Sequence, residues 1–372
     1  MGWCDLVISK VEASCLKVPI KTPYSGEPRT VGMVLVRIDT DDGPTGYGIA
    51  RDLERFGTRE LINRDLAPFL VGRDPMFIEE IWADASEEIT ATYKARMGVV
   101  GRAISACDIA LWDIKGKFLN QPIYKLLGGA SRDSVPVYIT CGFNVFDIDD
   151  VVGISAEMAE EGHPYLKYQV VAADRGNDVS VDVERLQAIR HAVGDDIKIL
   201  VDGNARFDLN HSREFVRRIE ALNISCFDHS VSTRDVRLML ELRKHTSIPL
   251  AARAFTESPW DNREMIVSGA VDIMHANVMD GGGYTTCLKI AHMAELFHLP
   301  FATGGGWQIH NGHLIAGIAN GWLSEVHLIF NEAYNAILID PPKVEKGRLY
   351  FSEKPGLGIE FNPDAIVEFQ DP

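Results

Sequence analysis

Polar residues that could do chemistry follow several short apolar runs in the second half of the chain. Each run has the length of a buried β-strand, and the polar residues come where the run ends. If the runs are parallel strands of one barrel, their ends meet on the face where barrel enzymes carry their catalytic groups. Position alone selects these residues: Lys167, Gln169, Asp202, Asn204, Asp228, His229, Arg253, Ala254, Asn277 and the stretch 304–313.

Two basic residues in this set offer different chemistry. A lysine that points into a barrel is a candidate general base with a lowered pKa, but Lys167 could equally be paired with Asp202 or Asp228. If Arg253 turned inward, its guanidinium would clamp a carboxylate through two hydrogen bonds. Strand alternation with Ala254 inward predicts the reverse for Arg253.

The segment GGGWQIHNGHL (304–314) is the most distinctive local feature. Its three glycines, Gly305 among them, let the backbone approach a ligand and could present amide groups to an oxyanion. His310 follows at the start of the next helix, and we expect it to act as a general acid. His313 is expected to be structural. Trp307 could line the pocket, although aromatic residues at such positions are as often part of the core.

The elements that must position these residues alternate between strands and helices. Most of the short apolar runs are followed by about 20 residues with a helical pattern, which indicates parallel βαβ units. A spacing of about 25 residues per unit favours a (β/α) barrel over an open sheet. The predicted strands are 135–140, 165–170, 197–201, 225–229, 249–252, 273–276 and 300–302.

The first half of the chain has a different pattern. Asp5–Leu16 and Gly32–Ile38 read as strands, and Asp41-Asp42-Gly43 predicts a hairpin turn. Residues 59–118 are helical in pattern. The end of the chain is again strand-like and should pack back on the N-terminal part. We therefore divide the chain into an N-terminal α+β domain (1–132), a barrel (133–342) and a C-terminal segment (343–372).

Composition narrows the class of partner. There are 37 Lys and Arg residues against 53 Asp and Glu, so the net charge is −16. Phosphate groups would be repelled, which argues against nucleic acid and anionic membranes as partners. No apolar stretch is long enough to span a bilayer. The six cysteines form no CxxC pair, which is typical of buried, reduced thiols in a cytoplasmic protein.

Several long motifs, taken in order, resemble the enolase superfamily, specifically its mandelate racemase/muconate lactonizing enzyme group. The resemblance covers nearly the whole chain. It implies a modified (β/α)7β barrel with an N-terminal α+β capping domain, and a proton abstracted α to a carboxylate to give an enediolate held by Mg2+. The motifs are GRAISACDIALWDIKGKFLNQPIYKLLGG (101–129), ILVDGNARFD (199–208), CFDHSVSTRD (226–235), AVDIMHANVMDGGGYT (270–285) and DPPKVEKGRLYFSEKPGLGIEF (340–361).

The resemblance implies three metal-binding carboxylates, of which this sequence keeps two. Asp202 matches the first position, and Asp228 matches the second. The third position is Ala254, whose side chain cannot coordinate an ion. Asp202 and Asp228 could still hold Mg2+ with Asn204 and water, or they could make hydrogen bonds alone. Glu257 lies nearby, but a ligand there would require a different loop geometry. Strand alternation turns His229, which follows Asp228, away from the interior.

The proton-transfer positions of the family are altered as well. The Lys-x-Lys pair reads Lys167-Tyr168-Gln169, and Gln169 cannot accept a proton at neutral pH. Asn277 replaces the aspartate of the Asp–His pair, and the matching histidine falls within the three glycines. His310 would take over that role from another position. The final glutamate of the family matches Glu325.

From these residues we expect a small-molecule carboxylate substrate, such as a sugar acid or lactone, and a homo-oligomer. Tyr24 and Arg51, with Arg29 and Arg55, lie in the two capping loops that match the family's specificity loops. Three hypotheses follow. The chain is an isomerase or lyase with an incomplete Mg2+ ligand set, a metal-independent variant of that chemistry that uses Arg253 and Gln169, or a non-catalytic ligand-binding relative.

Overall fold

The N-terminal domain is an antiparallel sheet covered by helices. The computed structural model describes residues 6–51, 55–93, 98–131, 133–172, 178–254 and 258–372. The sheet order is β14-β1-β2-β3, and the predicted hairpin turn joins β2 to β3. The strands are β1 (Ile8–Lys21), β2 (Pro28–Thr40), β3 (Gly46–Arg51) and β14 (Gln370–Asp371). The helices are α1 (Arg55–Leu61), a π-helical turn (Ile62–Leu66), α2 (Ala67–Leu70), α3 (Ile78–Tyr93) and α4 (Val99–Phe118).

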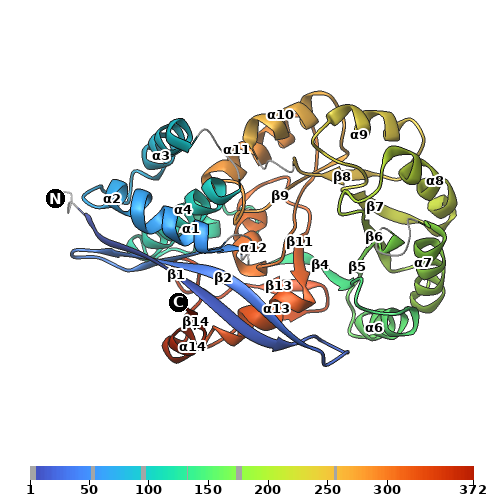
Figure 1. Cartoon of the computed structure of the whole chain (residues 1–372), viewed down its shortest axis with the longest axis horizontal. Coiled ribbons are helices and arrows are strands. Elements are labelled where there is room, and N and C mark those ends of the chain that lie inside the picture. Colours follow the sequence, from blue (N-terminus) through green and yellow to red (C-terminus); the bar gives the residue numbers. More distant parts are fainter. Residues whose placement is uncertain (1–5, 52–54, 94–97, 132, 173–177, 255–257) are drawn as a thin grey trace.

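The second half of the chain forms a parallel barrel (Figure 1). Neighbouring strands pair in parallel from β4 to β10, and β11 pairs with β4 on its other side. Backbone hydrogen bonds between β10 and the segment before β11 close the ring: Trp322 N donates to Phe301 O, and Thr303 N donates to Leu323 O. The barrel strands are β4 (Ser134–Gly142), β5 (Tyr165–Gln169), β6 (Lys198–Asp202), β7 (Ile224–Asp228), β8 (Leu250–Ala252), β9 (Ile273–Ala276), β10 (Phe301–Thr303) and β11 (Ser324–His327).

Helices surround the barrel and separate its strands along the chain. All seven predicted strands are present within a residue or two of their expected ends. The prediction did not include β11, because its four residues hold Glu325 and His327 and lack an apolar run. The helices are α5 (Ile123–Leu126), α6 (Ile148–Glu160), α7 (Ser180–Val193), α8 (Leu209–Ile219) with a 3-10 turn (Glu220–Leu222), α9 (Val236–Arg243), α10 (Pro259–Val267), α11 (Gly283–Leu296), α12 (Gln308–Gly317) and α13 (Leu328–Ala336).

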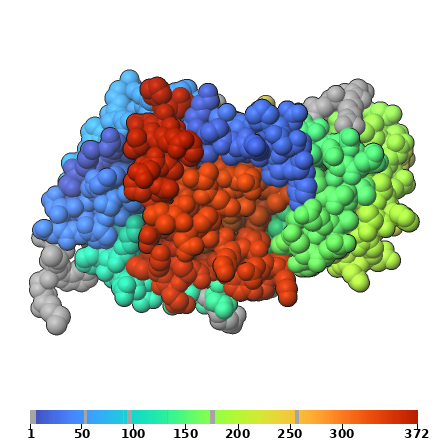
Figure 2. All heavy atoms as spheres, turned by 90° about the horizontal axis from the view of Figure 1, so that it is seen from below, coloured from blue at the N-terminus to red at the C-terminus, as the bar shows by residue number. Residues whose placement is uncertain are grey.

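The C-terminal segment returns to the N-terminal domain. After β12 (Val344–Glu345), β13 (Arg348–Tyr350) and α14 (Pro363–Glu368), strand β14 adds to the edge of β1. Arg55 in α1 donates hydrogen bonds to Asp371 at 2.7 and 3.1 Å. Figure 2 shows the red C-terminal residues seated between the blue segments of the first domain. Both ends of the chain therefore contribute to the capping domain.

Helix α4 docks the capping domain onto the barrel. Asp108 of α4 accepts hydrogen bonds from the backbone and hydroxyl of Thr285 in the first turn of α11. Ser105 Oγ accepts from the amides of Gly282 and Gly283 at 2.6 and 3.1 Å. These groups satisfy amides that have no partner within α11 itself, so one helix N-terminus fixes the two domains together.

A layer of side chains fills the barrel below its C-terminal end. Its members point inward, and residues next to them on the same strands, such as Val201 and Leu250, pack outward against the helices. The layer separates the polar strand ends from the opposite mouth of the barrel. It consists of Tyr138, Leu200, Cys226, Ala251, Ile273, Ala302 and Leu323.

Two further expectations concern membranes and cysteines. Among the described residues, every helix is too short or too polar to cross a bilayer. Cys4 lies outside the described residues. The remaining cysteines, at positions 15, 107, 141, 226 and 287, are buried.

The contact between β3 and α4 tolerates no added side chain, and this gives a first prediction. A Cβ on Gly48 would overlap the carbonyl oxygen of Ala106 in α4, so neither backbone can give way easily. We expect Gly48→Ala to lower the free energy of unfolding by about 2 kcal/mol or more, measured by urea unfolding.

The matched control is Gly153→Ala in α6. Gly153 is exposed, and its added Cβ would meet no atom within 4 Å. Helix propensity predicts that this control is more stable than the parent by about 0.5–1 kcal/mol. Equal stability of the two variants would contradict the close packing of β3 on α4.

Candidate active site

The ammonium group of Lys167 lies at the centre of the barrel among three carboxylates. Lys167 Nζ is 2.9 Å from Asp202 Oδ2 and 3.0 Å from Asp228 Oδ2, and Glu325 Oε1 lies at 3.7 Å. The Lys167 side chain is only 3% exposed. These four residues, with His229 and His275, form what we call the strand-end cluster.

The register of the barrel brings the cluster together. Lys167 lies on β5, and Asp202 and Asp228 are the last residues of β6 and β7. Asp202 pairs with Asp228 across these neighbouring strands. Since the strands are parallel and in register, inward-pointing residues at their ends must approach one another.

The environment of Lys167 keeps it protonated. Burial by itself lowers the pKa of an ammonium group, but Asp202, Asp228 and Glu325 outweigh burial and hold the pKa of Lys167 well above its usual value. The prediction of a lysine with a lowered pKa is therefore wrong for the site as it stands. The alternative, a lysine paired with both aspartates, is confirmed.

Asp228 divides its two oxygens between different partners. Oδ2 accepts from Lys167, whereas Oδ1 lies 2.9 Å from Nδ1 of His229 and 3.3 Å from Nδ1 of His275. The prediction that His229 points away is wrong. Its backbone takes a left-handed conformation with φ of 42°, which breaks strand alternation and turns the ring toward Asp202 and Asp228.

Glu325 stabilises the opposite side of the cluster. It accepts hydrogen bonds from the Thr140 hydroxyl and from the amide of Gly306, the latter at 2.7 Å. Burial by itself raises the pKa of this carboxyl, but Lys167, His327 and these hydrogen bonds together lower the pKa of Glu325 to about 2. Glu325 is therefore ionised in this site.

At the position expected to hold the third metal ligand, Ala254 faces away from the barrel interior. Ala254 packs with the outer core, on the same side as Ala252, and its amide donates to Asn262 Oδ1 at 2.8 Å. Arg253 instead reaches inward, and its side chain is 12% exposed. A side chain at Gly304 would begin 3.5 Å from Arg253 Nη1. The prediction that alternation turns Arg253 outward is wrong, because the alternation starts from Ala251 inside the barrel.

A second polar group joins the capping domain to the barrel around Asp280. This buried carboxylate accepts from Arg51 Nη1 and Asn277 Nδ2, both at 2.9 Å, and lies 3.4 Å from Arg102 Nε and 3.8 Å from Arg253 Nη2. Burial raises its pKa, but the arginines outweigh burial and lower it.

Arg51 and Asn277 occupy the place where the family pattern has its Asp–His pair. A side chain at Gly305, where φ is 90°, would collide with Asn277 Nδ2 and would lie 3.2 Å from Arg51 Nη1. Gly305 is therefore required by this packing, and the site has room for no histidine there.

His310 does not reach the strand-end cluster. It is fully buried in α12, its Nδ1 lies 3.3 Å from the hydroxyl of Tyr334, and burial lowers its pKa to about 3. The prediction that His310 donates a proton to substrate is therefore wrong, because the imidazole is buried away from the strand ends. Trp307 is part of the same core, edge-on to Tyr334. His313 contacts Leu357 O at 3.0 Å, as a structural residue would.

The remaining predicted residues lie at the edge of the site or away from it. Gln169 follows Lys167 on the same face of β5 and is partly exposed. Asn204 is exposed. Its backbone N–H donates a hydrogen bond to Asp202 Oδ1 at 2.9 Å, which orients that carboxylate. Tyr24 lies beside Glu157 of α6, and burial together with that carboxylate raises its pKa to about 12. Glu257 lies outside the described residues.

Three site residues have no counterpart in the sequence prediction. His275 is the third residue of an apolar strand, so its inward direction is visible only from the barrel. Arg102 and Asp280 lie on a helix and in a loop from different domains, and their contact depends on how the cap docks. The motif AVDIMHANVMD contains both His275 and Asp280. Strand-end position selected only Asn277 from this motif, so the other two residues were missed.

The strand-end cluster offers donors for a metal ion. Ligand atoms from Asp202, Asp228 and His229 all lie within 4.8 Å of one another. A family-type Mg2+ site would need a third carboxylate, and Ala254 faces away from it. The described residues therefore fit a divalent ion, but with an imidazole among the donors, which is a poorer match for Mg2+ than oxygen alone.

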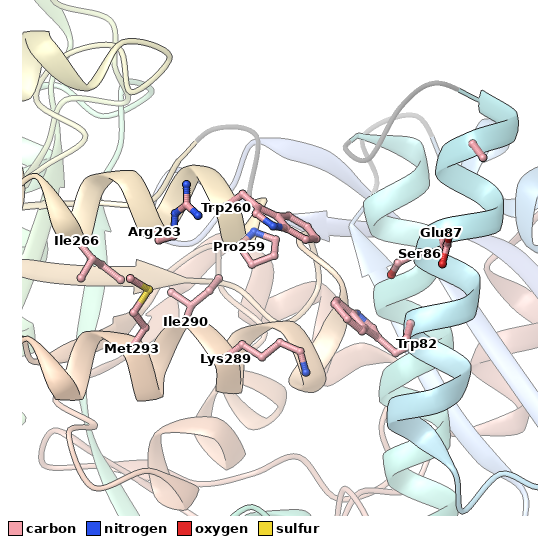
Figure 3. Close-up of a pocket in the computed structure, with 12 residues that line it drawn as sticks. Trp82, Ser86, Glu87, Pro259, Trp260, Arg263, Ile266, Lys289, Ile290 and Met293 are labelled. Atoms are coloured by element: carbon pink, nitrogen blue, oxygen red, sulfur yellow. The ribbon is translucent and has the colours of Figure 1, made fainter.

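An open groove elsewhere on the molecule holds none of the cluster residues. It runs between α3 of the capping domain and helices α10 and α11 (Figure 3). Trp82, Trp260, Lys289 and Met293 are among its lining residues. The candidate active site is the buried cluster at the strand ends and not this groove.

Comparisons with known proteins agree with this geometry. The model of the mandelate racemase/muconate lactonizing enzyme N-terminal domain matches residues 7–128, and the enolase C-terminal domain-like model matches residues 152–365. The arabinonate dehydratase of Saccharolobus solfataricus is 32% identical over 91% of this chain and 90% of its own length.

Two solved structures are similar over nearly their whole length. The 3,6-anhydro-D-galactonate cycloisomerase from Zobellia galactanivorans has a TM-score of 0.86 at 27% identity, covering 98% of this chain and all of its own. The L-talarate dehydratase from Polaromonas sp. JS666, in complex with Mg and L-glucarate, has a TM-score of 0.86 at 25% identity, covering 99% of this chain and 98% of its own. This chain therefore belongs to the mandelate racemase/muconate lactonizing enzyme family of the enolase superfamily, as its motifs predicted.

Proposed function

We propose that this chain is an isomerase or lyase that removes a proton α to the carboxylate of a sugar acid or of its lactone. The observation that carries the proposal is the placement of Lys167 between Asp202 and Asp228 at the catalytic face of the barrel. The similarity to a sugar-acid dehydratase and to a sugar-acid cycloisomerase supports this substrate class.

Lys167 is the residue that moves the proton. In the site as described it is an ammonium group, which can stabilise a developing enediolate but cannot accept a proton. Asp202 and Asp228 would hold a divalent ion, whose charge would offset a developing enediolate. With these carboxylates engaged by the ion, the pKa of Lys167 would be lower. After losing its own proton to solvent, Lys167 would accept the α-proton at Nζ, and the Tyr138 hydroxyl, which accepts a hydrogen bond from Nζ at 3.5 Å, would help to hold it in place.

Arg253 and the glycine segment bind the substrate carboxylate. The guanidinium of Arg253, the Tyr138 hydroxyl and the Glu325 carboxylate surround Gly304, where a Cβ would lie 3.4 to 3.9 Å from each of them. A guanidinium binds a carboxylate in two-point fashion. Arg51 adds positive charge from the capping domain, so both domains contact substrate.

A metal-independent form of the reaction is the second candidate. Lys167 and Arg253 already place two cations at the strand ends, and the third family carboxylate is absent. In this form Arg253 would hold the substrate carboxylate, and Lys167 would first pass its own proton to Asp202 and then accept the α-proton. The reaction would persist after treatment with a chelator. Weak Mg2+ binding is expected in either form, because only two carboxylates remain.

Two properties of the whole molecule stay predictions. We place the protein in the cytoplasm, which its buried cysteines at positions 15, 107, 141 and 226, outside any disulfide, support. We expect a homo-oligomer, which sedimentation velocity would test.

Replacing Lys167 tests the proposed function directly. We expect Lys167→Met to reduce exchange of the substrate α-proton with deuterated water by roughly 10²–10⁴-fold, because the proton carrier is lost. The measurement is proton NMR with a panel of sugar acids and lactones, with divalent ions present and absent.

The control for this variant is Lys198→Met, at the opposite end of a barrel strand, where the lysine is exposed. It removes one charge from the same domain and should exchange at the parent rate. No exchange by the parent with any acid in the panel would indicate the third hypothesis, a non-catalytic ligand-binding relative.

Glu325 gives a prediction for stability against pH. Its pKa is about 2 in the folded chain against 4.5 when unperturbed, so its carboxylate stabilises the fold above about pH 4.5, and this contribution is lost as the pH falls toward 2. The shift corresponds to about 3 kcal/mol. We expect Glu325→Gln to lose less free energy of unfolding than the parent between about pH 5 and about pH 3 in urea titrations.

Glu332→Gln is the matched control, since Glu332 is exposed on α13. This variant should follow the pH dependence of the parent. If Glu325→Gln also follows it, the ion pair with Lys167 does not stabilise the fold.

A further inference from the structure

We propose that Asp280 restricts the substrate to acids with a single carboxylate, because it occupies the arginines that would otherwise bind a second one. The inference rests on the proposed function, since it names the substrate class of the same site. Sugar acids carry one carboxylate when only the first carbon of the sugar is oxidised (aldonic acids) and two when both ends are oxidised (aldaric acids). The two classes therefore differ by one negative charge at the far end of the molecule.

Asp280 lies between β9 and α11, where the capping domain meets the barrel. Arg51 of β3 donates from Nη1 to Asp280 Oδ2 at 2.9 Å, and Arg102 of α4 donates from Nε to Oδ1 at 3.4 Å. Arg253, which follows β8, is more distant, with Nη2 at 3.8 Å from Oδ2. Each oxygen of Asp280 therefore contacts an arginine of the cap, and the arginine of the barrel has the longest contact.

Two buried amide side chains hold Asp280 in place. Asn277 Nδ2 donates to Asp280 Oδ2 at 2.9 Å. Asn311, which is completely buried, donates from Nδ2 to Asn277 Oδ1 at 3.1 Å and to Gly306 O at 2.8 Å. Since the oxygen of Asn277 accepts from Asn311, its NH2 group faces Asp280. The carboxylate of Asp280 is therefore fixed by a buried polar network and is not a mobile side chain that a substrate could displace.

Asp280 carries its negative charge in this setting. Its side chain is only 4% exposed, and burial by itself raises its pKa, but Arg51, Arg253 and Arg102 outweigh burial and hold the pKa below its usual value. The cap arginines thus already face a carboxylate that belongs to the protein. A second substrate carboxylate could approach Arg51 only beside Asp280, which would repel it.

The position of Arg253 explains how one carboxylate is still bound. Its Nη1 would lie 3.5 Å from a Cβ at Gly304, on the side of the Tyr138 hydroxyl, whereas its Nη2 is directed toward Asp280. Arg51 lies against the next residue, with Nη1 3.2 Å from a Cβ at Gly305. The carbon chain of a sugar acid held at Arg253 is long enough to bring its far end toward Arg51 and Asp280. A hydroxyl group is tolerated there, and a carboxylate is repelled.

Binding measurements on the full-length protein with paired acids test the inference. The panel holds aldonic acids derived from pentoses and hexoses, each with the aldaric acid of the same configuration, and calorimetry measures their affinities with Mg2+ present and absent. We expect the parent to bind the aldonic member of at least one pair at least about tenfold more tightly than the aldaric member. The absence of such a preference in every pair would overturn the inference.

Replacing Asp280 tests its part in this preference. Asp280→Asn removes the charge and keeps the size of the side chain. We expect it to bind aldaric acids at least about tenfold more tightly than the parent does, with less than about threefold change for aldonic acids. Asp280→Glu keeps the charge and should keep the preference, whereas a merely structural role would weaken the binding of both classes alike. An unchanged preference in folded Asp280→Asn would overturn the inference, and Asp280→Ser replaces this variant, with the same outcomes, if it does not fold.

The matched control is Asp272→Asn, at the opposite end of β9. Asp272 forms an ion pair with Arg243 at 2.6 Å, so this variant also removes the charge of a paired aspartate beside the same strand. It should show the preference of the parent. A preference that changes as much as in Asp280→Asn would mean that the position of the charge is unimportant, and the role of Asp280 would be refuted.

These results separate the two proposals. Proton exchange by the parent without a preference between the two classes of acid would overturn this inference and leave the proposed function standing. A preference for aldonic acids that depends on Asp280, without exchange of any α-proton, would do the opposite.

Discussion

Burial of one ammonium group among carboxylates is the interaction on which the centre of this molecule depends. Taking Lys167 out of water is costly, and the cost is offset only because Asp202, Asp228 and Glu325 are held within 3.7 Å of it by three different strands. That arrangement requires the barrel to be closed and in register. It also explains why the pKa of Lys167 is raised and that of Glu325 is lowered.

The capping domain extends this charge network. Arg51 and Arg102 cross from the cap to Asp280, which also lies near Arg253 of the barrel. The same interface is fixed at a second place, where α4 supplies Ser105 and Asp108 to the first turn of α11. Docking of the capping domain and the electrostatics of the site are therefore linked. Loss of the arginine contacts to Asp280, or of the contact between α4 and α11, should shift the charged side chains at the strand ends.

The site is rearranged relative to its family pattern in a consistent way. Ala254 turns outward and Arg253 inward, Asn277 and Arg51 fill the space of a histidine at Gly305, and His229 and His275 approach Asp228. Each change removes an acid or adds a nitrogen near the strand ends. Together they make the strand ends less acidic, which suits an anionic substrate better than it suits Mg2+.

The sequence by itself determined the fold, all but one barrel strand and the identity of Lys167, Asp202 and Asp228, because apolar periodicity and strand-end position are local properties. Glu325, on the strand that was not predicted, was identified only by the resemblance to the family. Whether a side chain points inward was decided only by the tertiary structure. A left-handed backbone at His229 and the true phase of alternation in β8 reversed two predictions. The sequence placed His310 shortly after the three glycines and so suggested a catalytic role. In the structure it packs into the core, because helix α12 turns it away from the barrel. The approach of His275 and Asp228, on strands that are not neighbours, depends on barrel closure, which no local pattern encodes.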